Sequence, residues 1–78
     1  MNIVVKENYK LQALIQDKYG AYHAIIYRER TEDYVFCWNY NIANGTWGQG
    51  HYVTTFKSAV AVMKEVLVPD VYFKGEAV

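Results

Sequence analysis

Few side chains in this sequence could coordinate a metal. Cys37 is the only cysteine, and His23 and His51 are the only histidines. A structural zinc site needs four cysteine or histidine ligands at short paired spacings. These three residues are expected on three different strands, so carboxylates would have to complete the ligand set. We therefore expect neither a metal site nor a cofactor.

Side chains for nucleophilic or acid–base catalysis are equally scarce. Cys37 or Ser58 would need a neighbouring base to act as a nucleophile. A lone cysteine in the middle of a strand usually behaves as a small apolar side chain, and serine in a first helical turn commonly bonds the local backbone. Glu32 and Asp33 are adjacent in a predicted connector, where they are solvated. Because no set of residues fills the nucleophile, base and stabiliser roles together, we predict that the protein is not an enzyme.

The stretch NIANGTWGQGHY, residues 41–52, contains three glycines and invites comparison with a phosphate-binding loop. Gly45, Gly48 and Gly50 are spaced as G-x-x-G-x-G, whereas the dinucleotide fingerprint is G-x-G-x-x-G between a strand and a helix. The pair Asn44-Gly45 between aromatic-rich runs instead predicts a hairpin with a type I′ turn. Gly48 and Gly50 then fall in the returning strand, where glycine often marks a bulge or a close backbone approach.

Aromatic residues provide the strongest candidate site. The chain has eight tyrosines and two tryptophans, and these residue types are enriched at the buried centres of protein interfaces. Their alternative role is to complete a small core. The expected protein-binding residues follow the alternation of the run YVFCWNY and add one residue from the next strand: Tyr34, Phe36, Trp38, Tyr40 and Trp47. If Phe36 and Trp38 point under the helix instead, the candidates become Ile25, Tyr27 and Tyr52.

The apolar periodicity predicts the elements that position these side chains. Tyr9, Leu11, Ala13 and Ile15 alternate with polar residues as in a strand, with Leu14 as the one violation. Further strands are predicted at residues 21–29, whose two faces both carry β-branched and aromatic side chains, and at 34–40 and 46–53.

A helix follows the predicted strands. Thr55 is a suitable N-cap, and Pro69 ends the helix soon after residue 67. The segments Val71–Lys74 and MNIVV are expected to add short strands or to pack along the sheet. The apolar stripe of the helix consists of Phe56, Ala59, Val60, Met63, Val66 and Leu67.

The predicted fold is a single α+β domain over residues 1–78. Its three- or four-stranded antiparallel meander packs against one C-terminal helix in two layers. One helix covers one sheet face, yet apolar residues occupy both faces. We therefore expect an apolar sheet face to remain uncovered, and such a patch usually marks a binding surface.

Composition narrows the class of partner. A hydrophobic fraction of 53% excludes intrinsic disorder. Eight basic and eight acidic residues give a formal net charge of zero, so no polyanion-binding surface is indicated. A second copy of the chain is the leading partner, because two uncovered sheets could pack together about a twofold axis. A foreign protein is the next candidate. Nucleic acid stacked on Trp38 or Tyr40 is a third and is not favoured.

The predicted location is the cytoplasm. A single cysteine suits a reducing compartment, and the start MNIVVKEN has too few apolar residues for a signal-peptide core. The uncharged apolar run Ala59–Met63 is far shorter than the roughly 20 residues of a membrane span, so no membrane association is expected.

The segment Trp47-Gly-Gln-Gly50-His-Tyr52, followed by a helix with Phe56 and Ala59, resembles a pattern in small uncharacterised proteins of phages and mobile elements of Gram-positive bacteria. The resemblance covers residues 34–67. It implies an accessory protein of a phage or mobile element that acts by protein contact, or alternatively an inhibitor of a host defence protein. It implies no catalytic residue.

Overall fold

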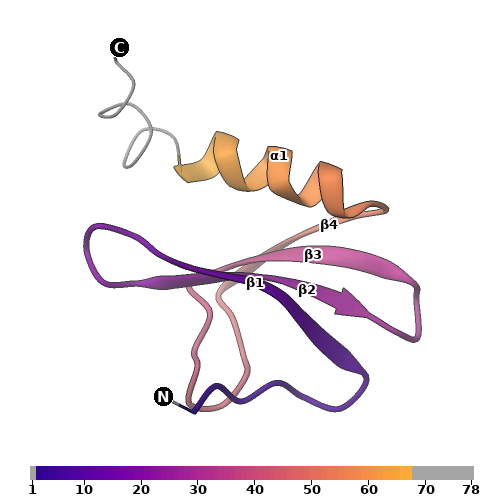
Figure 1. Cartoon of the computed structure of the whole chain (residues 1–78), viewed down its shortest axis with the longest axis horizontal. Helices are drawn as coiled ribbons and strands as arrows, with labels where there is room; N and C mark the ends of the chain where they lie inside the picture. The colour runs from indigo at the N-terminus through magenta and orange to yellow at the C-terminus, as the bar shows by residue number, and fades with distance from the viewer. Residues whose placement is uncertain (1, 68–78) are drawn as a thin grey trace.

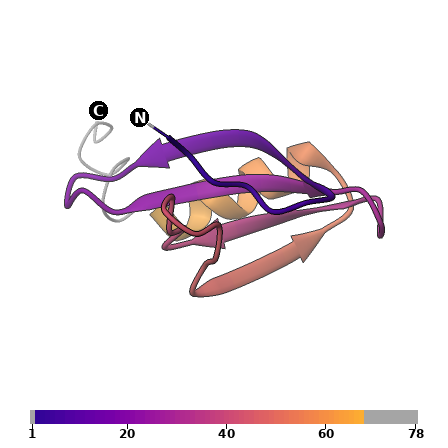
Figure 2. The ribbon, with the colours of Figure 1, turned by 90° about the horizontal axis from the view of Figure 1, so that it is seen from below.

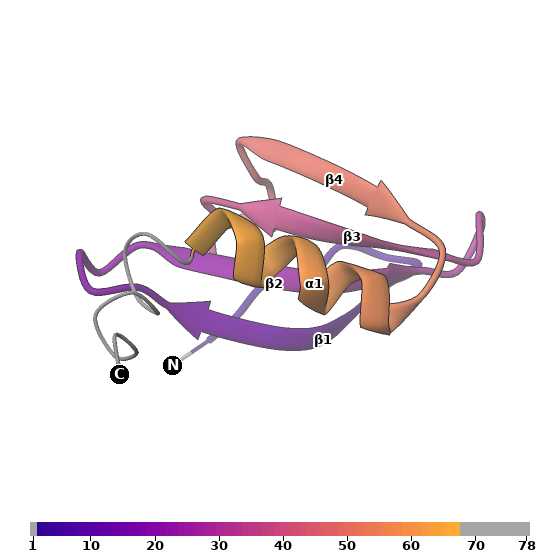
Figure 3. The ribbon, with the colours of Figure 1, turned by 90° about the horizontal axis from the view of Figure 1, so that it is seen from above.

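The computed structural model describes residues 2–67, which form a four-stranded antiparallel sheet and one helix. The sheet order β1-β2-β3-β4 is that of a meander, and α1 lies across one face (Figures 1 and 3). This confirms the predicted α+β architecture, in its four-stranded form. The predicted segment Val71–Lys74 lies outside the described residues. The elements are β1 (Tyr9–Gln16), β2 (Tyr22–Arg28), β3 (Asp33–Trp38), β4 (Gln49–Val53) and α1 (Phe56–Leu67).

Helix α1 begins at the predicted cap and packs through five of the six residues of the predicted stripe; the sixth, Phe56, is 41% exposed. The Thr55 hydroxyl oxygen accepts a hydrogen bond of 3.0 Å from the backbone N–H of Ser58, which satisfies one of the free amides of the first turn. Ala59 is fully buried against Ile25 and Phe36 of the sheet. The same core contains Leu67 and, partly buried, Val60, Val62, Met63 and Val66.

A bulge in β1 reverses the alternation of its side chains between the two faces of the sheet. Its register with β2 shifts between Leu11 and Ala13. Leu11 and Leu14 therefore pack on the side away from α1, whereas Ala13 and Ile15 pack on the helix side. The prediction that Tyr9, Leu11, Ala13 and Ile15 share one face was wrong, because one extra residue in a strand inverts the alternation that follows it. Leu14 is consequently no violation of the strand pattern.

The sheet face away from α1 is covered by the chain itself. Residues 2–8 and the loop 39–48 both lie below this face (Figures 1 and 2). The backbone N–H of Val4 donates to the Ile42 carbonyl at 2.9 Å, and the Tyr40 hydroxyl donates to the Val4 carbonyl at 2.6 Å. Partly buried side chains from these segments, including Ile3 and Val5, complete a second core over β2 and β3.

The expectation of an uncovered apolar sheet face was therefore wrong, because residues 2–8 and the loop 39–48 cover it. Residues 2–5 of the segment MNIVV pack along the sheet, one of its two predicted roles, and residues 2–6 form no strand. The second core is built on four fully buried strand residues, Ala24, Ile26, Val35 and Cys37. Strand β2 is thus covered on both faces.

The loop between β3 and β4 closes a hairpin, but with a different turn from the predicted type I′. Asn39 has a φ of 59°, which ends β3 at Trp38. Asn41 and Thr46 form an isolated bridge, and the Asn41 carbonyl accepts from the Gly45 N–H at 2.8 Å. Only Gly45 of the pair Asn44-Gly45 has positive φ, so the two-residue turn, which needs positive φ at both residues, is excluded.

Within residues 2–67, no helix is long and apolar enough to cross a bilayer.

Candidate functional site

The five predicted binding residues do not form one surface. Phe36 is fully buried beneath α1, with Tyr34 half-buried beside it. Tyr40 is 4% exposed because residues 2–8 cover it, and Trp47 is partly buried next to it. Trp38 is the most accessible of the five, at 37%. A partner therefore cannot reach Phe36 or Tyr40 in this conformation, which corrects their assignment as contact residues.

The alternation expected along residues 34–40 fails at its end. Tyr34 and Phe36 contribute to the helix-side core, whereas Tyr40 contributes to the core on the other side. The left-handed backbone of Asn39 causes this change, because the strand pattern cannot continue through a residue with positive φ.

Aromatic rings do cluster on the face away from α1. The centroids of Tyr9 and Trp47 lie 5.7 Å apart, and Trp47 stacks on Tyr40 at 6.2 Å. Tyr52 belongs to the same face because it pairs with Val35, a residue of that core. We call Tyr9, Tyr40, Trp47 and Tyr52 the aromatic cluster. Among the alternative candidates named from the sequence, Tyr52 is 52% exposed and Ile25 is fully buried.

Gly50 makes room for two rings of this cluster. A Cβ atom on Gly50 would lie 2.9 Å from both the Trp47 Nε1 atom and the Tyr52 hydroxyl oxygen. Real Cβ contacts are not that short, so the absence of a side chain allows both rings to approach the β4 backbone. The sequence predicted a close approach at this glycine, and the structure shows that the approaching groups are aromatic.

A small depression opens beside the cluster. Its volume is about 250 Å³, and its lining comprises Lys6, Tyr9, Gly45, Thr46 and Trp47. Sites for drug-sized ligands occupy roughly 300–1,000 Å³. This depression is therefore slightly smaller than the usual range for such sites.

Two cations near the cluster, Arg28 and Lys10, are paired with carboxylates. The Arg28 guanidinium donates to both Asp33 oxygens, at 2.8 and 2.7 Å, and lies 4.6 Å from the centroid of the Tyr52 ring. This bidentate pairing lowers the pKa of Asp33 to about 2 and raises the pKa of Arg28. On β1, the Lys10 ammonium lies 3.2 Å from Glu29. These pairs offset two of the positive charges near the aromatic rings, and Lys6, which lines the depression, is a third cation beside them.

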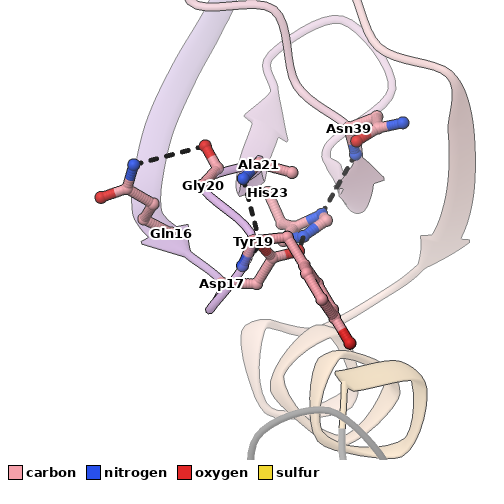
Figure 4. Close-up of polar contacts among 7 residues, drawn as sticks. All are labelled: Gln16, Asp17, Tyr19, Gly20, Ala21, His23 and Asn39. Atoms are coloured by element: carbon pink, nitrogen blue, oxygen red, sulfur yellow. Dashed lines mark hydrogen bonds and ion pairs between the residues drawn. The ribbon is translucent and has the colours of Figure 1, made fainter.

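A buried polar network connects the β1–β2 turn to the end of β3 (Figure 4). The His23 side chain is 1% exposed, and its Nε2 atom lies 2.8 Å from an Asp17 oxygen. Its Nδ1 atom accepts a hydrogen bond of 3.1 Å from the Asn39 N–H. Because Nδ1 accepts, the proton is assigned to Nε2, which donates to Asp17. The other Asp17 oxygen accepts from the backbone amides of Tyr19 and Ala21.

This network is buried, and its hydrogen bonds are internal to the fold. Both His23 nitrogens are occupied, and its ring lies between those of Phe36, at 6.2 Å, and Trp38, at 6.1 Å. The hydrogen bond from His23 is the largest cause of the lowered pKa of Asp17. The sequence did not predict this pair, although an aspartate at a turn six residues before a strand histidine is a signal that could have indicated it.

The Cys37 thiol, the cysteine candidate named from the sequence, is buried. Burial raises the pKa of the Cys37 thiol to about 12, so it is not a thiolate at neutral pH. Metal ligation needs several histidine, cysteine or carboxylate groups together. In the part of the chain that the structure describes, no three such groups converge on a metal position.

The two edges of the sheet differ in how well they are protected against pairing with a strand of another molecule. β1 carries the bulge near Gln12 and a charged Lys10, both features that discourage pairing with another strand. β4 has the sequence QGHYV, without charge, proline or bulge. It lies at the opposite edge (Figure 3). The side chains of Gln49, His51 and Tyr52 are exposed along it.

Comparison of the chain with protein families, curated proteins and solved structures finds no match.

Proposed function

We propose that the protein is a non-enzymatic binding module that acts by protein–protein contact, with self-association as its leading form. The observation that carries this proposal is the exposed, uncharged edge strand β4. An edge strand presents unpaired N–H and C=O groups, and natural proteins usually protect such an edge with charge, proline or a bulge. β1 has such protection, whereas β4 does not.

Large exposed rings beside this edge support the proposal. Trp38 is 37% exposed and pairs with Gln49 at one end of β4. Tyr52 is 52% exposed and lies near the other end. Tyrosine and tryptophan contribute large contact areas at protein interfaces. A strand added at β4 would therefore have aromatic side chains close to both of its ends.

Charge favours a protein partner over nucleic acid. Phosphate neutralisation supplies most non-specific affinity for nucleic acid, and the formal net charge of this chain is zero. Arg28 and Lys10 are engaged with carboxylates. An accessory role in a phage or mobile element is part of the proposal and is supported by the resemblance of residues 34–67 alone.

Multi-angle light scattering over a wide range of protein concentration tests self-association. We expect the mass to rise from that of a monomer to that of a dimer with increasing concentration. The dimer should persist at high salt, because exposed ion pairs are screened by salt and β4 contributes no charged side chain. A monomer at every concentration would rule out self-association as the function.

A further inference from the structure

In the described sheet, the edge of β4 is the best position for an additional strand. A twisted sheet grows by antiparallel pairing at an edge that has regular backbone geometry. The β3–β4 register is regular from Tyr34↔Val53 to Trp38↔Gln49, so β4 presents an unbroken strand of five residues. The bulge in β1 breaks that regularity at the other edge.

We infer that β4 of one copy pairs with β4 of a second copy, antiparallel about a twofold axis that passes beside His51. This inference rests on the proposed self-association and specifies its geometry. His51 is the central residue of Gln49–Val53. Pairing centred there places His51 opposite itself, Gly50 opposite the partner's Tyr52, and Gln49 opposite the partner's Val53.

The sequence of β4 complements itself in this arrangement. A glycine in a strand leaves a gap that an aromatic ring on the neighbouring strand can cover. Within one chain, the Tyr52 ring already reaches over Gly50, since its Cε1 atom would lie 3.0 Å from a Cβ atom there. In the dimer, each Tyr52 lies opposite the partner's Gly50 and meets the Trp47 and Tyr52 rings that already cover that glycine. The same side of the sheet carries the aromatic cluster, so these contacts extend it across the axis.

The absence of charge on β4 favours a second copy over a strand of unrelated sequence. Like charges directly opposite one another destabilise a strand pair, and QGHYV contains no Lys, Arg, Asp or Glu that would place two such charges together. The net charge of zero also removes long-range repulsion between identical chains. A charged foreign strand would find no opposite charge on β4.

The resulting assembly has a defined shape. Four strands from each copy form one sheet of eight, with order β1-β2-β3-β4 continuing into the same order reversed. The twofold axis runs perpendicular to this sheet, because it relates two antiparallel edge strands. Both α1 helices therefore lie on one face of the sheet, and both segments formed by residues 2–8 lie on the other.

Opposite charges at residue 51 test the pairing. The variants H51K and H51E each place two like charges beside the axis, so we expect each to dimerise roughly fivefold more weakly than the wild type. An equal mixture should form a heterodimer at least as tight as the wild-type dimer. The control is Q12K on the other edge, which should dimerise normally. Light scattering gives the masses, and circular dichroism verifies that each variant is folded.

Disulfide trapping provides a second readout that needs no change in affinity. Under mild oxidation, H51C should form an interchain disulfide, whereas Q12C should not. Both variants retain the buried Cys37, so any disulfide formed through Cys37 contributes equally to both. If the wild type dimerises but H51K and H51E do so equally well, the β4 pairing is wrong and self-association stands. If the wild type remains monomeric, both proposals fail.

Discussion

Truncation of Tyr40 to alanine is expected to lower the free energy of unfolding by about 3–5 kcal/mol, as for other large buried aromatic side chains. Tyr40 is 4% exposed, stacks on Trp47 and holds the Val4 carbonyl through its hydroxyl. The substitution would therefore remove the centre of the core that joins residues 2–8 to the sheet. Urea unfolding at neutral pH measures the loss.

The variant Y40F separates the contribution of the Tyr40 ring to stability from that of its hydroxyl group. It should cost about 1 kcal/mol, the usual net contribution of one hydrogen bond, because the Val4 carbonyl loses its 2.6 Å donor. A loss below about 1 kcal/mol for Y40A itself would show that residues 2–8 do not form a stable layer. The sheet face away from α1 would then be available to partners.

Replacement of His23 by leucine should destabilise the protein by about 2–4 kcal/mol, because each buried polar group left without its partner costs about 1–3 kcal/mol. The groups left unpaired are the Asp17 Oδ2 oxygen and the Asn39 N–H. H51L is the matched control, since His51 is exposed and surface substitutions usually change stability by no more than about 0.5 kcal/mol. Urea unfolding at low protein concentration compares the two variants without interference from the dimer.

The cost of H23L should depend on pH. The folded-state pKa of Asp17 is lowered, chiefly by the hydrogen bond from His23. A carboxyl group with a depressed pKa contributes stability above its ordinary value of about 4, and that stability is lost as the pH falls toward the folded-state value. The difference between wild type and H23L should therefore shrink between about pH 5 and pH 2. An unchanged difference over that range would show that the Asp17 carboxylate does not depend on His23.

Local sequence signals were sufficient for most of the fold. Thr55 and the apolar stripe that begins at Phe56 predicted α1, because capping and helical periodicity are short-range properties. Asn44-Gly45 predicted the hairpin but not its turn, since only Gly45 adopts positive φ. The bulge near Gln12 could not be predicted, because it depends on the pairing of β1 with β2 rather than on β1 alone.

The candidate site depended on contacts between distant parts of the chain. The segment MNIVV has the composition of a strand, and nothing in it specifies that Val4 contacts Ile42 and Tyr40. This contact supplies the missing cover of the sheet and buries Tyr40. Trp38 remains exposed because it lies at the end of β3, beyond the main core. The proposed binding surface therefore lies at the β4 edge rather than on a sheet face.

Burial of both sheet faces changes the form that self-association can take. Face-to-face packing of two sheets would require α1 or residues 2–8 to leave the positions shown in Figure 1. Edge pairing requires neither, because the backbone groups at the free edge of β4 are already presented in strand geometry. The same edge could add a strand from a foreign protein, which would appear as binding without self-association.

Amide hydrogen exchange at low and high protein concentration tests the use of this edge most directly. We predict that exchange of amides within Gln49–Val53 slows as the concentration rises, because pairing protects the N–H groups that face away from β3. Exchange along Tyr9–Gln16, at the other edge, should stay the same. If exchange of the β4 amides is independent of concentration, or if protection arises on β1 or α1 instead, the β4 edge is not the surface through which this protein associates.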